Sequence, residues 1–263
     1  TPKYSWVLSG RGSGFLAPDF SRYNESSQKD GSFSLRVPYY FNIAPDRDLL
    51  LALTYMSSRN LIYEGRYRQL IAPKISPDHQ DSIWSFEAKY LPKDKITDLK
   101  RWLINFSEEL DLSKNTHVSV KYNRVSDPNF FREIARTDTD IKTLKSHFKV
   151  SYKDDENSLS GFVLTENEQI VNSGVHEYIR ALEGSISKTF NEDTKSPISV
   201  DLVSTKFMHQ NNIKETGNRT HADVEISRIL NINYPQIKPS ASIAVTNYSL
   251  KNNPNIDNVL SNH

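Results

Sequence analysis

Apolar and polar residues alternate one by one along many segments of the chain, and this pattern constrains the fold more than any other feature of the sequence. Residues 32–37 place Phe33, Leu35 and Val37 on one side and two serines and an arginine on the other. A period of two puts successive side chains on opposite faces of a β-strand. The pattern recurs about every 20 residues, which predicts about twelve or thirteen antiparallel strands and an all-β fold.

Helical signals are weak by comparison. Residues 94–100 and 128–135 are each expected to form a helical turn or two within longer loops. The longest aliphatic run spans residues 49–53, far short of the roughly 20 apolar residues that a membrane-spanning helix needs.

Composition excludes several functional classes. The chain holds 33 Lys or Arg and 32 Asp or Glu, a net charge of +1, so it has no excess of positive charge to neutralise nucleic-acid phosphates. It contains no cysteine, which excludes disulfides and thiol chemistry within the chain. Its seven histidines include no HxH or HExxH spacing, so the sequence predicts no metal site.

The alternation itself allows two architectures. A soluble β-sandwich buries its apolar faces between two sheets, whereas a membrane β-barrel turns them toward lipid. Two features agree with a barrel: the polar face is strongly charged, and aromatic residues gather near the ends of the apolar faces. These aromatic residues are Tyr39, Phe41, Tyr55, Tyr90, Tyr122, Tyr152 and Tyr248. Composition and pattern alone leave the two architectures about equally favoured.

Several motifs in order along the chain are similar to those of one family. They occupy residues 13–18, 37–45, 64–68, 89–94, 101–103 and 121–131, the last reading KYNRVSDPNFF. The series resembles the barrel of the LptD family, the lipopolysaccharide-assembly proteins of the bacterial outer membrane, most specifically over residues 10–135 and more weakly to about residue 250. The resemblance implies an antiparallel transmembrane β-barrel that is only partly represented.

The resemblance also implies domain boundaries. Residues 1–12 would be the end of a periplasmic jelly-roll, and residues 13–263 the N-terminal half of the barrel. The opening Thr1-Pro2 and the polar end suggest a piece of a longer protein. Half a barrel leaves two unpaired strand edges, so we expect either an open sheet or a smaller, artificially closed barrel.

The function that the resemblance implies is transport without covalent chemistry and without a cofactor. Lipopolysaccharide would arrive along the jelly-roll from an LptA-type periplasmic bridge. Its acyl chains would enter the membrane sideways through a lateral gate, while its sugars would pass through the lumen. An LptE-type lipoprotein would plug the barrel, outer-membrane lipids would surround it, and nucleic acid would have no role.

Two sets of residues follow as candidate sites. Pro18 and Pro38 lack the backbone N–H of a strand residue, so they either mark strand ends or bulges or, as the resemblance implies, weaken the seam between the first and last strands. The polar faces carry the candidates for residues facing the lumen, some of them suited to binding phosphate. These are Arg36, Glu64, Arg66, Arg68, Glu87, Lys89, Lys121 and Lys149.

Two alternatives come from other classes. The first is a soluble β-sandwich that binds carbohydrate or lipid, which would bury its apolar face. The second is an outer-membrane enzyme such as a barrel phospholipase, which would need a serine and a histidine on neighbouring strands near one membrane interface.

Overall fold

A computed structural model describes residues 12–24, 31–71, 82–135, 141–172, 174–192, 194–211, 214–228, 230 and 237–251. These residues form two compact units. Unit 1 comprises Thr1–Glu109, Lys121–Leu144 and Val171–Ser173, and unit 2 comprises Leu110–Val120, Lys145–Ile170 and Gly174–His263. The expected jelly-roll junction, residues 1–12, lies outside the described residues except for Gly12.

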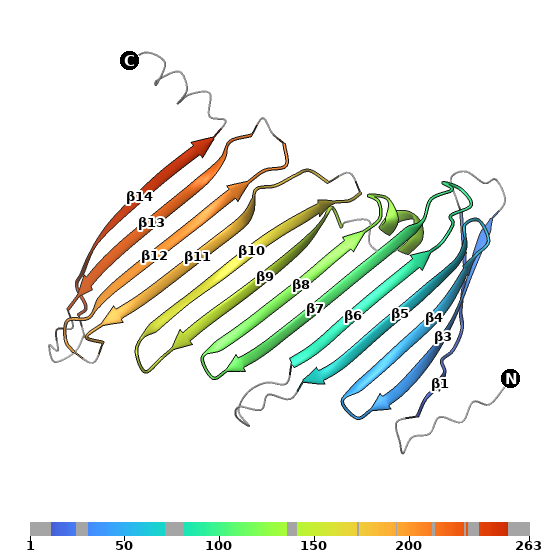
Figure 1. The fold of residues 1–263 in the computed structure, drawn as a ribbon, viewed down its shortest axis with the longest axis horizontal. Coiled ribbons are helices and arrows are strands. Elements are labelled where there is room, and N and C mark those ends of the chain that lie inside the picture. The colour runs from blue at the N-terminus through green and yellow to red at the C-terminus, as the bar shows by residue number, and fades with distance from the viewer. Residues whose placement is uncertain are drawn as a thin grey trace, which may run out of the picture. The chain divides into compact units, whose positions relative to one another are not determined.

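The fold is all-β, as the alternation predicted. The strands are β1 (Gly14–Phe15), β2 (Asp19–Tyr23), β3 (Ser32–Ala44), β4 (Arg47–Met56), β5 (Asn60–Ile71), β6 (Ser82–Leu91), β7 (Arg101–Ser113), β8 (Thr116–Val125), β9 (Thr143–Asp154), β10 (Leu159–Ile170), β11 (Ile179–Phe190), β12 (Ile198–Met208), β13 (Thr216–Ser227) and β14 (Ser240–Lys251). Each strand pairs with the next in the chain, apart from β1 and β2, which both pair with β3 (Figure 1).

The sheet is a single antiparallel meander that does not close among the residues the structure describes. It has 14 strands rather than the predicted twelve or thirteen because residues 16–18 interrupt the first strand and divide it into β1 and β2. The expected fold class, an open antiparallel part of a barrel, is confirmed.

The strands of unit 1 keep a continuous register, and this register decides which side chains share a face. Val37 lies opposite Leu53, Leu53 opposite Tyr63, and Tyr63 opposite Tyr90, so one apolar row crosses β3 to β6. The neighbouring row runs from Ala52 to Glu64 to Lys89 on the other face. Directly opposed residues of antiparallel strands project to the same side. The predicted amphipathic faces are therefore real in unit 1.

Helical structure is confined to one short element in the described ranges. A π-helix, η1 (Phe131–Ala135), forms within the segment 128–135 that was expected to be helical. The other segment, residues 94–100, contains a single turn, in which the Asp98 N–H donates to the Asp94 carbonyl four residues earlier. None of the helices in the described part of the chain has the length and apolar character needed to cross a bilayer.

Candidate functional site

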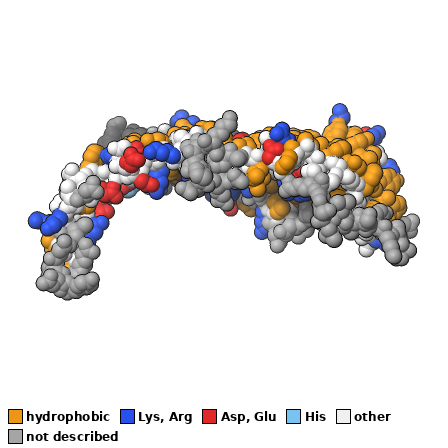
Figure 2. All heavy atoms as spheres, turned by 90° about the horizontal axis from the view of Figure 1, so that it is seen from below, with side chains coloured by type: hydrophobic (Ala, Val, Ile, Leu, Met, Phe, Trp, Pro, Cys, Tyr) orange, Lys and Arg blue, Asp and Glu red, His pale blue; other side chains and the backbone are white. Residues whose placement is uncertain are grey.

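The apolar face of the sheet is exposed. Along β3 and β4 in unit 1, Leu35, Val37, Leu51 and Leu53 all remain accessible, and Phe15 on β1 is 76% exposed. Figure 2 shows hydrophobic side chains gathered over the sheet at the end that carries the first strands. A soluble sandwich would bury such a face against a second sheet. Large contiguous exposed apolar patches mark surfaces that meet lipid or a partner.

The opposite face of unit 1, called the polar face below, carries the candidates Arg36, Glu64, Arg66, Arg68, Glu87 and Lys89, which share it by register. Several pair with each other: Arg36 Nε lies 3.2 Å from Glu64 Oε2, and Lys89 Nζ lies 3.8 Å from the same oxygen. Arg68 pairs with Asp48 at 2.7 Å. The polar face thus carries both positive and negative side chains, several of them in ion pairs, and is not uniformly cationic.

Lys121 and Lys149 are placed only by alternation along their own strands. Lys121 lies two residues after Ser119 on β8, and Ser119 Oγ lies 2.8 Å from His147 Nε2 on β9. Lys149 lies two residues after His147, and its Nζ is 4.7 Å from the centre of the Phe162 ring on β10. Residues two apart on a strand share a face, so Lys121 shares the face of Ser119 and Lys149 that of His147. Whether this face lines a lumen stays a prediction.

At one end of unit 1 the polar face is covered by a segment that we call the cap, residues 126–135. Phe130, Phe131 and Ile134 of the cap are buried. They belong to one apolar cluster with residues at the strand ends: Tyr23, Met56, Ile62, Leu91, Leu103 and Val125, together with Leu144 and Val171. Met56 and Ile62 lie in the same alternating rows as Thr54 and Glu64. The side chains on this face are therefore apolar at the strand ends, where the cap packs on them.

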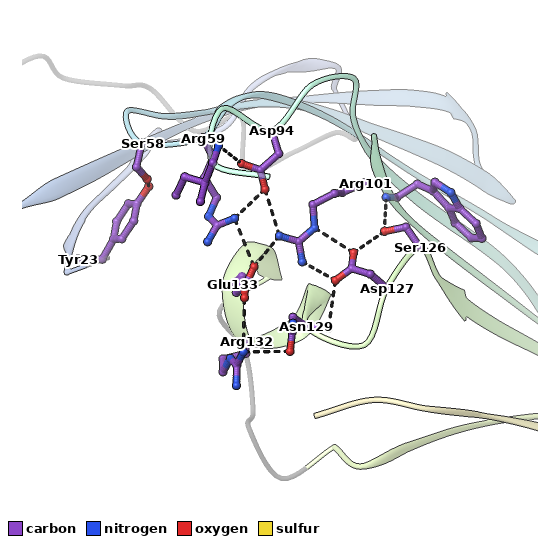
Figure 3. Close-up of polar contacts among 12 residues, drawn as sticks. Tyr23, Ser58, Arg59, Asp94, Arg101, Ser126, Asp127, Asn129, Arg132 and Glu133 are labelled. Carbon is purple, nitrogen blue, oxygen red and sulfur yellow. Dashed lines mark hydrogen bonds and ion pairs between the residues drawn. The ribbon is translucent and has the colours of Figure 1, made fainter. Parts of the chain in front are cut away.

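A network of buried ion pairs fastens the cap to the strands (Figure 3). The Arg101 guanidinium, 2% exposed, donates to Asp127 and Glu133 of the cap through contacts of 2.6 and 2.7 Å. It also contacts Asp94 at 3.1 Å. Arg59, in the turn between β4 and β5, contacts the same Asp94 oxygen at 2.7 Å and Glu133 at 3.4 Å. The two arginines thereby join three connections of the sheet: the turn between β4 and β5, the connection between β6 and β7, and the cap between β8 and β9.

Asp94 is the centre of this network and has no exposed surface. Burial alone raises the pKa of its carboxyl group. The Ile96 N–H, which donates to Oδ1 at 3.0 Å, and the guanidinium groups of Arg101 and Arg59 outweigh burial and hold the pKa below its usual 3.8. Asp94 is therefore charged at neutral pH, as a buried carboxylate can be only when it is paired and hydrogen-bonded.

The first strand is attached to β3 in two separate stretches. Phe15 of β1 lies opposite Tyr39, whereas Asp19 of β2 lies opposite Arg36, so the first strand carries one extra residue between the two stretches. Pro18 lies in this interruption and Pro38 opposite it. The Pro38 carbonyl accepts a bond of 3.0 Å from the Leu16 N–H. Since a strand residue directs its N–H and C=O to the same side, the N–H that Pro38 lacks would also have faced the first strand.

The far end of the first strand is held more firmly. Tyr23, the last residue of β2, is buried, and its hydroxyl lies 2.7 Å from Ser58 Oγ in the turn beside Arg59. Between this anchor and the proline interruption, a cavity of about 310 Å³ opens on the polar face. Ser21, Arg36 and Glu64 line it together with Ile134 and Ala135 of the cap.

A serine–histidine pair does occur on neighbouring strands, as the enzyme alternative required. Ser119 Oγ and His147 Nε2 are 2.8 Å apart, but in the part of the chain that the structure describes His147 contacts no carboxylate. Two other histidines do lie near carboxylates: His117 Nδ1 is 2.8 Å from Asp111 Oδ1, and His176 Nδ1 is 3.4 Å from Glu168 Oε1. The Ser151 hydroxyl donates to the backbone carbonyl of His117. No nucleophile, base and orienting acid come together among these residues. The described ranges also hold no group of three or more His, Cys, Asp or Glu placed to bind a metal ion.

Sequence reasoning missed the cap and Arg59. The motifs at residues 89–94, 101–103 and 121–131 supported the family resemblance without being assigned a site, yet they contribute Asp94, Arg101 and Asp127 to one network. One signal was present in the sequence: Met56, Ile62 and Leu91 are apolar residues at positions where the alternation of their strands places polar residues. Their position predicts that something packs on that face.

An open antiparallel meander with an exposed apolar face and a charged opposite face is the wall of a membrane β-barrel. Comparisons with known proteins agree. A family model described as "LPS transport system D" (LptD) matches residues 100–259. The chain therefore belongs to the LptD family, and this membership places it in the outer membrane.

Curated relatives carry the same family name. The LPS-assembly protein LptD of Cupriavidus pinatubonensis is 36% identical over 137 residues, covering 52% of this chain and 15% of the relative. That of Idiomarina loihiensis is 26% identical over 234 residues, covering 86% of this chain and 28% of the relative. The chain thus spans well under a third of the length of these relatives. A solved structure of OmpT, an outer membrane protein of Vibrio cholerae, is 13% identical with a TM-score of 0.29, over 88% of this chain and 87% of that chain.

Proposed function

We propose that this chain forms part of the wall of an outer-membrane translocon that inserts lipopolysaccharide into the outer leaflet. The observation that carries the proposal is the two-faced sheet, apolar and exposed on one side and lined with paired charges on the other. A glycolipid has acyl chains that require lipid and sugars that require water. A wall with one face for each permits both to move along the same protein.

The polar face suits the passage of phosphorylated sugars. Arg36 and Lys89 both lie near the carboxylate of Glu64, so an arriving phosphate competes with that carboxylate for the two cations. Sites that hold a ligand only through exchangeable surface pairs bind weakly, because exposed ion pairs contribute about 0–1 kcal/mol each. Weak, repeated contacts favour movement over retention.

The lateral gate is proposed to lie at the first strand. Pro18 and Pro38 remove hydrogen bonds from the middle of its pairing, while Tyr23 holds its end against Ser58. A strand fixed at one end and weakly paired in its middle can part from its neighbour without detaching. The last strand of the complete barrel would form the other side of the seam.

The remaining parts of the machine are also proposals. An LptE-type lipoprotein would occupy the lumen on the polar side, and an LptA-type bridge would deliver lipopolysaccharide through the jelly-roll. We further propose that the chain performs no covalent chemistry, in which case Ser119→Ala leaves lipopolysaccharide export unchanged. Loss of export in that variant with normal folding would instead favour an enzyme.

Site-specific photo-crosslinking tests the path directly. A photoreactive residue replaces Arg66 on the polar face of the complete protein, and Tyr63 on the apolar face serves as the control position. We expect position 66 to form adducts with lipopolysaccharide that disappear when lipid A synthesis is blocked. Adducts at position 63 alone, with none at position 66, would contradict a path along the polar face.

A further inference from the structure

The connection between β6 and β7, residues 92–100, presents two adjacent side chains in opposite directions, and we call it the basic loop. Asp94 points into the buried network with Arg59 and Arg101. The Lys95 N–H donates to the Arg59 carbonyl at 2.9 Å, yet its Nζ lies 5.7 Å from the centre of the Tyr55 ring. The network therefore fixes the backbone that carries Lys95.

Tyr55 shows where the Lys95 amine lies. Tyr55 is opposite Leu35 on one side and Leu61 on the other, in the apolar rows of the sheet, and it is 39% exposed. It is next to the last residue of β4, so it marks the end of the apolar face. Lys95 thus places a positive charge at the rim of the surface that faces lipid. A lysine over an exposed aromatic ring is stabilised there by the ring's electron-rich face.

The rest of the basic loop has the same mixed character. Ile96 and Leu99 are 38% and 59% exposed, so the loop presents two aliphatic side chains at its surface. Lys93, Lys95 and Lys100 are exposed, whereas Asp94 is buried with its arginines and Asp98 pairs with Lys93 at 2.8 Å. Lys95 and Lys100 therefore remain as positive charges that no carboxylate of the loop balances.

Aliphatic side chains with lysines beside them suit one environment, the boundary between acyl chains and headgroups. There the aliphatic groups enter the acyl region and the amines extend to the phosphates. We propose that the basic loop binds the phosphate groups of membrane lipid headgroups at the rim of the sheet, with Lys95 and Lys100 as the ligands and Ile96 and Leu99 as apolar anchors. This goes beyond the proposed transport path, because it concerns the outside of the wall and not its polar face.

The test uses the complete protein with its lipoprotein partner, purified in detergent and titrated with bisphosphorylated lipid A. Binding is followed by native mass spectrometry in wild type and in K95Q/K100Q. Each lysine near an anionic lipid surface changes binding roughly five-fold. We expect the double variant to bind lipid A about five- to twenty-fold more weakly and to bind dephosphorylated lipid A like wild type.

The matched control is K114Q. Lys100 directly precedes β7 and Lys114 directly follows it, so both lysines flank the same strand. The Lys114 amine is already paired with Glu156 at 3.3 Å. We expect K114Q to bind lipid A within two-fold of wild type. Equal binding by wild type and K95Q/K100Q would overturn the proposal. So would displacement of the lipid by millimolar inorganic phosphate, which would identify a free-anion site.

Export is measured separately in the same strains. Weaker lipid A binding by K95Q/K100Q supports the basic loop whether or not surface lipopolysaccharide falls. Failure of the photo-crosslinks on the polar face would refute the transport path and leave this result standing. The two ideas can therefore fail independently.

Discussion

The guanidinium of Arg101 donates two hydrogen bonds to the carboxylate of Asp127, from Nε to Oδ2 at 2.9 Å and from Nη2 to Oδ1 at 2.6 Å. Two-pronged arginine–carboxylate pairing fixes orientation as well as distance. The first residue of β7 and the first turn of the cap are therefore held in one geometry. The Ser126 hydroxyl, which donates to the same carboxylate at 2.7 Å, accepts the Trp102 N–H at 3.1 Å.

Replacing Arg101 is expected to release the cap. Arg101→Met removes the shared donor and leaves Asp127 and Glu133 without it in a largely buried site, and breaking buried ion pairs typically costs about 3–5 kcal/mol. Arg101→Lys is expected to recover only part of this loss, because an ammonium group cannot make the two-pronged contact. Hydrogen exchange of residues 126–135 in the complete protein measures the effect.

Arg132→Gln is the control for this prediction. Arg132 lies next to Glu133 on η1, but its side chain is 55% exposed and its ion pair with Glu133 is long, at 3.4 Å. We expect its exchange rates to match wild type. Equal protection of the cap in Arg101→Met and wild type would mean that the apolar cluster alone holds the cap.

Acid is expected to weaken the cap through Asp94. Its pKa is lower in the folded protein than the usual 3.8, so the ionised form stabilises the fold. That contribution is complete above about pH 4 and is lost as the pH falls through the lowered folded value. Cap protection measured from pH 7 to pH 3 should therefore decline more steeply in wild type than in Asp94→Asn, which is less protected at pH 7. Parallel profiles in the two proteins would show that other carboxylates govern the acid response.

The strand pattern could be predicted from sequence because it is local. Alternation in residues 32–37 or 84–90 requires only that neighbouring residues face opposite sides, and it places the charges of Glu64, Arg66 and Arg68 on one face. The cap could not be predicted in this way. Asp94 lies in the connection between β6 and β7, Arg101 is the first residue of β7, and Asp127 follows β8. Only the pairing of β6, β7 and β8 brings their carboxylates and guanidinium together.

The interruption of the first strand shows the same limit. The sequence identified Pro18 and Pro38 as residues that remove ladder bonds, but not that Pro38 faces the interruption in the first strand in which Pro18 lies. We expect Pro18→Ala or Pro38→Ala to add one N–H to the pairing of the first strand, a gain of about 0.5–1.5 kcal/mol for each bond formed. A tighter first strand should slow lateral release, so less lipopolysaccharide reaches the cell surface and sensitivity to detergent rises. Pro92→Ala, outside this pairing, is the control. Normal export in both seam variants would contradict the gate.

Two glycines on adjacent strands of unit 2 give a test of the sheet register. A Cβ on Gly161 of β10 would lie 2.6 Å from the carbonyl oxygen of Ser185 on β11, closer than side chains approach backbone. A Cβ on Gly184 would meet no atom closer than the Phe162 carbonyl oxygen at 3.9 Å, an ordinary contact. Gly161→Ala should therefore push β10 from β11 and cost about 1–3 kcal/mol, whereas Gly184→Ala should be neutral. Thermal unfolding of the complete protein, followed by the loss of its heat-modifiable band on gels, compares the two. Equal midpoints would mean that β10 and β11 pair in another register.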